Sequence, residues 1–238
     1  MTREILGLEL DAPLMAFGGA RVDGQPSAYP VPTRSMIAGL LGNALGYRRT
    51  DSARLQALQD GLRLGIAVLR HGRVIRDHVA TDLGRPHMRG PMWTTEGRPV
   101  AREGSAATDV RLESRPYVAD AHILCAVAVA DAAVPAPTEL RDAVREPARP
   151  LFLGRAGCPA TDSLDADLVT AADVDEALDL LAAERGASIR KRHLPADLAA
   201  GRPGEQVEIV MGVKDWHLGV HAGQEVRTVR ADSDGDAS

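Results

Sequence analysis

An α+β fold is predicted by the order in which strand-like and helical patterns follow one another along the first 160 residues. An alternating apolar segment opens the chain, one amphipathic helix follows it, and strand-like segments then recur on both sides of a long basic insertion. The order strand, helix, strand, insertion, strand, helix, strand matches the β-α-β-β-α-β succession of a ferredoxin-like domain. We therefore expect a ferredoxin-like domain over 1–160 with a basic insertion at 80–115. A smaller, mostly β subdomain follows over 161–238, with a frayed tail at 228–238.

The first strand and the first helix are the best defined elements. Ile5–Leu10 alternates, which places Leu6, Leu8 and Leu10 on the core face. Residues 12–32 are rich in glycine and proline and predict an extended loop. Thr33 can cap a helix that Gly46 ends. The apolar positions of this helix form one stripe: Met36, Ile37, Leu40, Leu41, Ala44 and Leu45.

The later elements follow from shorter patterns. Strands are expected at Leu64–Arg70, Arg73–Val79, Pro116–Ala130, Arg149–Leu153, Ser188–His193, Gln206–Val213 and Trp216–His221. Helical segments are expected at Leu55–Leu62, Thr138–Arg145 and Asp173–Arg185. Trp216 is interpreted as a core residue of the C-terminal unit. Between Ala80 and Ser114 no periodicity is sustained, and unstructured connections of that length are usually functional or disordered.

The charges are distributed unevenly. Residues 63–115 contain ten arginines and six acids, a net charge of +4, whereas the whole chain has a net charge of −5. A basic segment in an acidic protein indicates a local site for a polyanion. A GC-rich genome would explain 26 arginines against two lysines, but it would not explain why the arginines cluster.

Composition excludes several classes of protein. No apolar run approaches the roughly 20 residues of a membrane span, and the start lacks the pattern of a signal peptide. The two cysteines are too few for a disulfide framework, and no histidine or acidic cluster has the spacing of metal ligands. We therefore expect a cytoplasmic protein without a cofactor, a metal or a membrane partner.

Two short segments could hold phosphate. Thr33, Arg34 and Ser35 at a helix start would offer backbone N–H groups, hydroxyls and a guanidinium to one anion. The alternative is an ordinary helix cap beside a solvated arginine. Gly154 and Arg155 follow an apolar segment and could present backbone amides to phosphate, or form a tight turn without a ligand.

The insertion contains planar and cationic side chains that could stack on unpaired bases and neutralise phosphates. These candidates are Arg85, His87, Arg89, Trp93, Arg98 and Arg102, and Arg21 is a lesser one. A solvated charged loop is the alternative, although Trp93 in a loop of Gly, Pro and Arg would have little core to join.

Three segments together resemble a known family. They are Ala12-Pro13-Leu14-Met15-Ala16-Phe17-Gly18 with Pro32-Thr33-Arg34-Ser35-Met36-Ile37-Ala38-Gly39-Leu40-Leu41-Gly42, then Arg115-Pro116-Tyr117-Val118-Ala119-Asp120-Ala121, then Arg149-Pro150-Leu151-Phe152-Leu153-Gly154-Arg155 with Cys158-Pro159. In this order they resemble the CasD family of CRISPR-associated proteins, subunits of the type I-E surveillance complex Cascade. Lys214-Asp215-Trp216 resembles the same family more weakly.

The resemblance implies a ferredoxin-like fold whose insertion forms a thumb on the 5′ handle of CRISPR RNA. It implies a subunit that does not cut RNA and whose partners are the backbone subunit CasC and the large subunit CasA. Target DNA would be recognised only indirectly, through pairing with the guide.

Two other functions remain open from the residues alone. A metal-independent ribonuclease would need an acid and a base at the cleaved bond, and Tyr47 with His122 or His87 is the candidate set. A protein-only scaffold would use the arginines of the insertion to pair with a neighbouring subunit.

Overall fold

The computed structural model describes residues 2–22, 25–82, 85, 91–93, 98–100, 110–130, 134–161, 164–198, 201 and 204–232. For residues 19–22, 25–28, 92–93 and 111 it describes the backbone alone. The chain forms two compact units, residues 1–75 with 117–238 and residues 76–116. Each unit is treated separately.

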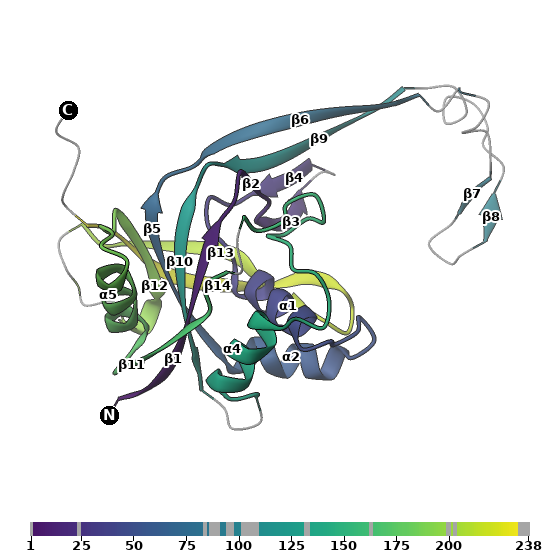
Figure 1. Ribbon diagram of the computed structural model, residues 1–238. Coiled ribbons are helices and arrows are strands. Elements are labelled where there is room, and N and C mark those ends of the chain that lie inside the picture. Colours follow the sequence, from purple (N-terminus) through teal and green to yellow (C-terminus); the bar gives the residue numbers. More distant parts are fainter. Residues whose placement is uncertain are drawn as a thin grey trace. The chain divides into compact units, whose positions relative to one another are not determined.

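A seven-stranded sheet is the centre of the first unit, and all its neighbouring strands are antiparallel (Figure 1). Its strands are β1 (Arg3–Asp11), β5 (Leu62–Arg70), β10 (His122–Val129), β11 (Asp167–Ala171), β12 (Lys191–Pro195), β13 (Gln206–Asp215) and β14 (Val220–Ala231). Their order across the sheet is β11-β1-β10-β5-β12-β14-β13. The predicted α+β class is confirmed.

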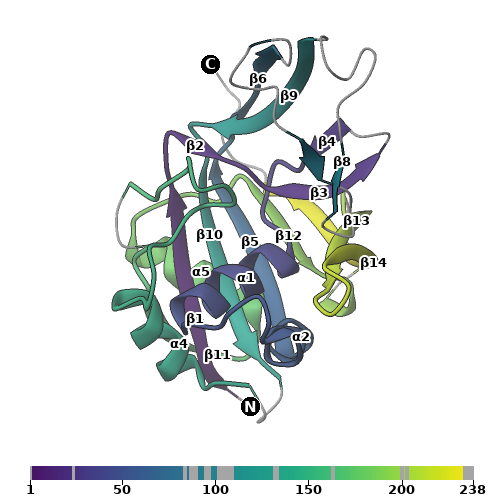
Figure 2. The same ribbon diagram turned by 90° about the vertical axis from the view of Figure 1, so that its right-hand side faces the viewer.

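Helices cover both faces of this sheet (Figure 2). On one face lie α1 (Arg34–Ala44), α2 (Ser52–Gly61) and α4 (Pro137–Arg145), and on the other lies α5 (Val174–Glu184). None of the described helices is long and apolar enough to cross a membrane.

The strand period of two explains how one sheet supports two cores. Leu6, Leu8 and Leu10 face α1 and are fully buried, as predicted, whereas Ile5 packs under α5. The central strands are consequently apolar on both faces, which is why their sequences lack a clean alternation with polar residues.

The connections set the place of each strand. Helices α1 and α2 connect β1 to β5, which run in the same direction on either side of β10, and α4 connects β10 to β11. The C-terminal strands β12, β14 and β13 continue the same sheet beyond β5. The expected domain boundary at residue 160 stays a prediction.

Four expectations differ from the structure. The segment predicted as one strand at Pro116–Ala130 is two strands, β9 (Val110–Ala119) and β10, because the strand is interrupted at Asp120, which adopts a left-handed φ of 58°, and β9 and β10 belong to different sheets. Residues 216–219 form a turn before β14 instead of a strand. The predicted fraying from residue 228 is wrong for 228–231, because β14 pairs there with β12 and buries Thr228 and Val229.

Residues 149–153 do not form the expected strand. They belong to an irregular loop in which Phe152 and Pro159 make one isolated β-bridge.

The smaller sheets include the strands of the insertion. Strands β6 (Arg73–Asp82) and β9 lie side by side, and β2 (Leu14–Met15) pairs with Val118 and Ala119 of β9. Strands β7 (Met92–Trp93) and β8 (Pro99–Val100) pair with each other, as do β3 (Gly18–Val22) and β4 (Gln25–Ala28). The expected strand at Arg73–Val79 is confirmed as part of β6, whereas the part of β9 from Val110 to Arg115 lies in the segment without sustained periodicity and was not predicted.

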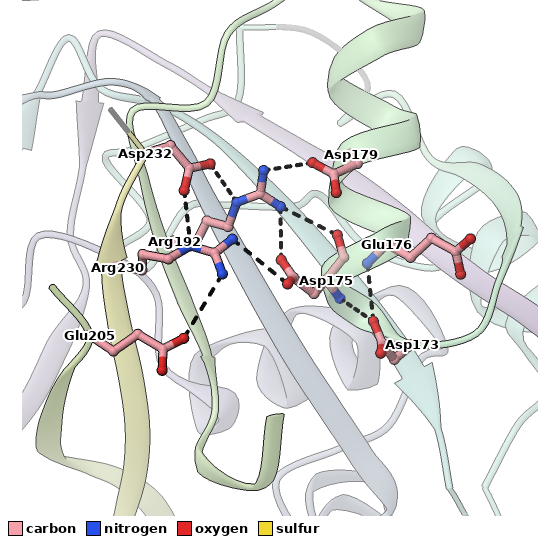
Figure 3. Close-up of polar contacts among 8 residues, drawn as sticks. All are labelled: Asp173, Asp175, Glu176, Asp179, Arg192, Glu205, Arg230 and Asp232. Carbon is pink, nitrogen blue, oxygen red and sulfur yellow. Dashed lines mark hydrogen bonds and ion pairs between the residues drawn. The ribbon is translucent and has the colours of Figure 1, made fainter. Parts of the chain in front are cut away.

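A group of charged side chains fastens α5 to the C-terminal strands (Figure 3). Arg192 of β12 donates to Asp179 at 2.6 Å, to Asp175 at 2.8 Å and to Asp232 at 2.6 Å. Arg230 of β14 pairs with Asp232 and, more distantly, with Asp175 and Glu205. We call these six residues the Arg192 cluster.

Candidate nucleic-acid interface

Two adjoining cavities lie in the first unit, between helix α1, the loop at 149–157 and the connection from β13 to β14. Their volumes are about 660 and 510 Å³. Five residues line both cavities: Gly39, Asn43, Arg149, Lys214 and Trp216. We call the two cavities together the basic groove.

The basic groove is lined by cations. They are Arg48, Arg49, Arg149, Arg155 and Lys214. Among the described residues that line either cavity, none is an aspartate or a glutamate. A concave surface with charge of one sign concentrates ligands of the opposite sign, so this surface favours a polyanion.

Arg149 is held in place by helix α1 and the turn after it. Its Nε donates to Oδ1 of Asn43 at 2.7 Å, and its Nη2 donates to the carbonyl of Tyr47. Asn43 in turn donates to the carbonyl of Pro150 at 2.8 Å. These bonds fix the start of the loop against α1 and keep the Arg149 guanidinium at the groove.

Gly154 and Arg155 form a turn that only glycine allows. Gly154 has a φ of +103°, and a Cβ there would lie 2.0 Å from the carbonyl oxygen of Ala16. The turn is closed by Leu153 N–H donating to Cys158 and by Ala16 N–H donating to Leu153. It places the Arg155 guanidinium 4.7 Å from the centre of the Tyr117 ring, at the groove.

Lys214 and Trp216 form the opposite wall. The Lys214 ammonium lies 4.3 Å from the centre of the indole ring, and Trp216 Nε1 donates to Gln59 Oε1 at 3.2 Å. Burial, and then the nearby Arg49, lowers the pKa of Lys214. Burial, and then Lys214, lowers the pKa of His221. Burial and a neighbouring cation thus both disfavour the charged forms of Lys214 and His221, and a bound phosphate would favour those charged forms.

The predicted helix-start site is only partly at the groove. Ser35 lines it, but Thr33 is fully buried and accepts a hydrogen bond from Met36 N–H at 3.3 Å as the cap of α1. The N–H of Arg34 donates to Oε2 of Glu225 at 3.2 Å, so the anion at this helix start is a carboxylate of the chain itself. The side chain of Arg34 lines a different cavity of about 370 Å³.

The candidates in the insertion belong to the other unit. Arg85 is exposed and pairs with Asp82 at 3.1 Å, and Arg98 is also exposed. Trp93 lies in β7, and Arg21, in the first unit, lies in β3, but their side chains are outside what the structure describes. His87, Arg89 and Arg102 lie outside the described residues.

The structure therefore brings together Ser35, Gly154 and Arg155 from the predicted set and adds residues that sequence reasoning missed. The main additions are Arg149, Lys214 and Trp216. The interpretation of Trp216 as core was incomplete, because its indole packs against the core and also lines both cavities. In the sequence, only the weak family resemblance at Lys214-Asp215-Trp216 had indicated that this segment could be functional.

Of the two candidate ribonuclease pairs, Tyr47 with His87 lies partly outside the described residues, and Tyr47 with His122 is separated. Tyr47 is buried on the α1 face of the sheet beneath Arg54, whose guanidinium lies 3.8 Å from the ring centre. His122 points to the α5 face, where its Nε2 lies 2.5 Å from Glu9, which also binds Arg185 at the end of α5. Two groups on opposite faces of a sheet cannot act on one phosphodiester.

Among the described residues, no three His, Cys, Asp or Glu side chains are placed to hold a metal ion.

Comparisons with known proteins agree on one family. The family model described as CRISPR-associated protein (Cas_Cas5) matches residues 5–229. The chain is 30% identical over 178 residues to the CRISPR system Cascade subunit CasD of Escherichia coli strain K12, covering 74% of this chain and 76% of the relative.

Solved structures agree on the fold. A chain of a CRISPR RNA-guided surveillance complex is similar with a TM-score of 0.63 and 19% identity, covering 97% of this chain and 89% of that one. A crystal structure of a Cas protein is similar with a TM-score of 0.52 and 21% identity, covering 96% and 93%. With a family model that matches nearly the whole chain, the protein belongs to the Cas5 family of CRISPR-associated proteins.

Proposed function

We propose that this protein is the non-catalytic subunit of a Cascade-type complex that binds the 5′ handle of CRISPR RNA and caps the backbone of the complex. The observation that carries the proposal is the basic groove, with five cations and no carboxylate among its described lining residues, in a member of the Cas5 family. RNA is a polyanion that a CRISPR-associated protein would bind, and its backbone phosphates would balance the positive charge of such a groove.

The side chains that line the groove suit a single strand better than a duplex. Its walls combine cations with apolar and aromatic surface from Met36, Phe152 and Trp216. Proteins that bind unpaired strands combine cations for the backbone with planar groups for the bases. The insertion would contribute a second contact region as a thumb, through Arg85, His87, Arg89, Trp93, Arg98 and Arg102.

We also propose that four of the seven strands form a ferredoxin-like domain, as expected for this function. The order β11-β1-β10-β5, with helices in the two crossovers, is the order that a β-α-β-β-α-β domain requires. Strands β12, β14 and β13 extend that domain and bring Lys214 and Trp216 to the groove.

The absence of catalysis is part of the proposal, supported by the separation of Tyr47 from His122. The partners that we propose are CRISPR RNA, the subunits CasC and CasA, and target DNA only through the guide, in the cytoplasm. The relative from E. coli is itself a Cascade subunit.

The proposal is tested with the purified full chain, CRISPR repeat RNA labelled at its end, and EDTA throughout. We expect a shifted, intact RNA whose binding weakens steeply as salt rises, because binding releases counterions. Arg155→Ala should bind about tenfold more weakly, whereas Arg3→Ala, which removes the same charge from the exposed start of β1, should bind like the wild type.

Two outcomes would overturn the proposal. Discrete cleavage of the repeat without metal would identify a ribonuclease. An absence of RNA binding both by the chain and by a complex assembled with CasC and CasA would favour a protein-only scaffold.

A further inference from the structure

Of the five described residues that line both cavities, Trp216 is the one with an aromatic ring. Each cavity, at about 660 and 510 Å³, lies in the size range of small-molecule sites. The indole therefore stands at the boundary between two compartments that are each large enough for one nucleotide.

The position of the indole is fixed by its neighbours. Its Nε1 donates to Gln59 Oε1 at 3.2 Å, and the backbone N–H of Trp216 donates to Gln56 Oε1 at 3.1 Å. On helix α1, a Cβ at Gly39 would lie 3.3 Å from the tip of the ring, so this glycine lets the ring lie close against the helix. A ring held at its polar edge and at its tip is preorganised, and little conformational entropy is lost when a base stacks on it.

The cations at the same boundary suit a phosphate. Arg149 and Lys214 line both compartments, and the Lys214 ammonium lies 4.3 Å from the centre of the indole. Because the ammonium lies over one face of the ring, a base would stack on the other face, and the phosphate next to that base would lie beside these two cations. Stacking of bases on an aromatic side chain together with neutralisation of the backbone is the general mode by which unpaired strands are bound.

We infer that Trp216 stacks on an unpaired base of the bound RNA with the face of its ring that Lys214 does not cover, and that Lys214 and Arg149 hold the phosphate next to that base. This inference rests on the proposed RNA-binding function and names the residue that contacts the bases. Trp216 is then a binding residue as well as part of the core.

The test uses the fluorescence of Trp216 itself, so it does not depend on a variant that fails to fold. The chain has two tryptophans, and Trp93→Phe leaves Trp216 as the sole reporter while keeping an aromatic ring at position 93. The protein is titrated with a short single-stranded RNA and with an abasic strand of equal length, and binding is followed separately by the anisotropy of a label on the strand.

We expect RNA to quench the emission of Trp216 as it binds, and the abasic strand to bind without quenching. Trp216→Leu should weaken RNA binding about tenfold and leave binding of the abasic strand unchanged. Trp216→Phe should restore RNA binding to within about twofold.

The contrary results separate this inference from the proposed function. RNA that binds with unchanged Trp216 emission, and equally well to Trp216→Leu, would overturn the stacking role and leave the RNA-binding function standing. Equal quenching by the RNA and the abasic strand would also overturn stacking, because the backbone alone would account for it. If neither strand binds the chain alone, the titration is repeated with the complex assembled with CasC and CasA, and an absence of binding there would overturn both the inference and the proposed function.

Discussion

The basic groove and the Arg192 cluster lie in the same unit and use the same kinds of side chain, but their charges are balanced differently. Arg192 is only 8% exposed and bonds three carboxylates (Figure 3). Burial alone would lower its pKa, but the hydrogen bonds to Asp179, Asp232 and Asp175 outweigh burial and raise it. In the groove the described lining residues supply cations without carboxylates, and the pKa of Lys214 is lowered.

The difference teaches that the number of arginines in a region says little about its function. The carboxylates of the Arg192 cluster balance the charge of its arginines, so these arginines need no external anion. Their role is to hold the fold together. The described lining of the groove contains cations and no carboxylate, which is the charge pattern that favours a polyanion. The partners of a cation, which sequence does not reveal, decide between structure and binding.

The largest effect is expected from reversing charge in the groove. Arg155→Glu with Lys214→Glu should weaken RNA binding about 1000-fold, since each reversal removes a charge-assisted contact and adds repulsion of the phosphate, together about 2 kcal/mol. Anisotropy titrations at constant salt measure this change. The matched control is Arg3→Glu with Arg141→Glu, which changes the net charge equally on β1 and α4; an equal loss in that control would show that net charge, and not the groove, determines affinity.

The next effect concerns the turn that carries Arg155. Gly154→Ala should lower the free energy of unfolding by about 3 kcal/mol, because its Cβ would collide with the Ala16 carbonyl at a left-handed φ. Gly157→Ala, where a Cβ meets nothing within 4 Å, should change it by less than about 0.5 kcal/mol. Chemical denaturation measures both, and equal stabilities would contradict the described turn.

The Arg192 cluster should respond in stability and not in binding. Arg192→Ala should lower the free energy of unfolding by about 2 kcal/mol, because three carboxylates lose their shared partner and Asp179 is partly solvated. RNA affinity, measured at a temperature where the variant stays folded, should match that of the wild type. A selective loss of RNA affinity in a folded Arg192→Ala protein would remove the distinction between the two regions.

The smallest effect comes from a buried histidine that stays neutral. Burial, followed by Arg227, Lys191 and His71, lowers the pKa of His193 to about 3. Between pH 6.5 and about 3 the unfolded chain takes up a proton at this residue and the folded chain does not, so stability falls as pH falls. From pH 7 to pH 5.5 the contribution is about 1 kcal/mol. Denaturation of the wild type and of His193→Gln at both pH values measures it, and an identical pH dependence of the two proteins would contradict it.

Much of the fold could be predicted from sequence because its signals are local. The alternation of Leu6, Leu8 and Leu10, the cap at Thr33 and the stripe of α1 are periodic patterns, and the structure has them as expected. The place of β12, β14 and β13 beside β5 could not be predicted, because strand pairing joins residues far apart in the chain. The interruption at Asp120 was missed because a left-handed aspartate has no periodic signal.

The candidate site was predicted only in part, for a similar reason. Gly154 and Arg155 were found because glycine beside arginine suggests a phosphate-binding turn, and the structure brings them to the groove. The use of Glu225 as the anion at the start of α1 could not be foreseen, since 191 residues separate it from Arg34. Lys214 and Trp216 likewise join Arg149 only through the pairing of the C-terminal strands and their contact with α1.

The most direct test of the central claim is the salt dependence of RNA binding by three proteins: the wild type, Arg155→Ala with Lys214→Ala, and Arg3→Ala with Arg141→Ala. A phosphate contact on a single strand contributes about 0.7 to the slope of log affinity against log salt. The groove variant should therefore lose about 1.4 from the slope, and the control variant should keep the slope of the wild type. A groove variant with the slope of the wild type would contradict the assignment of the basic groove as the site that binds RNA.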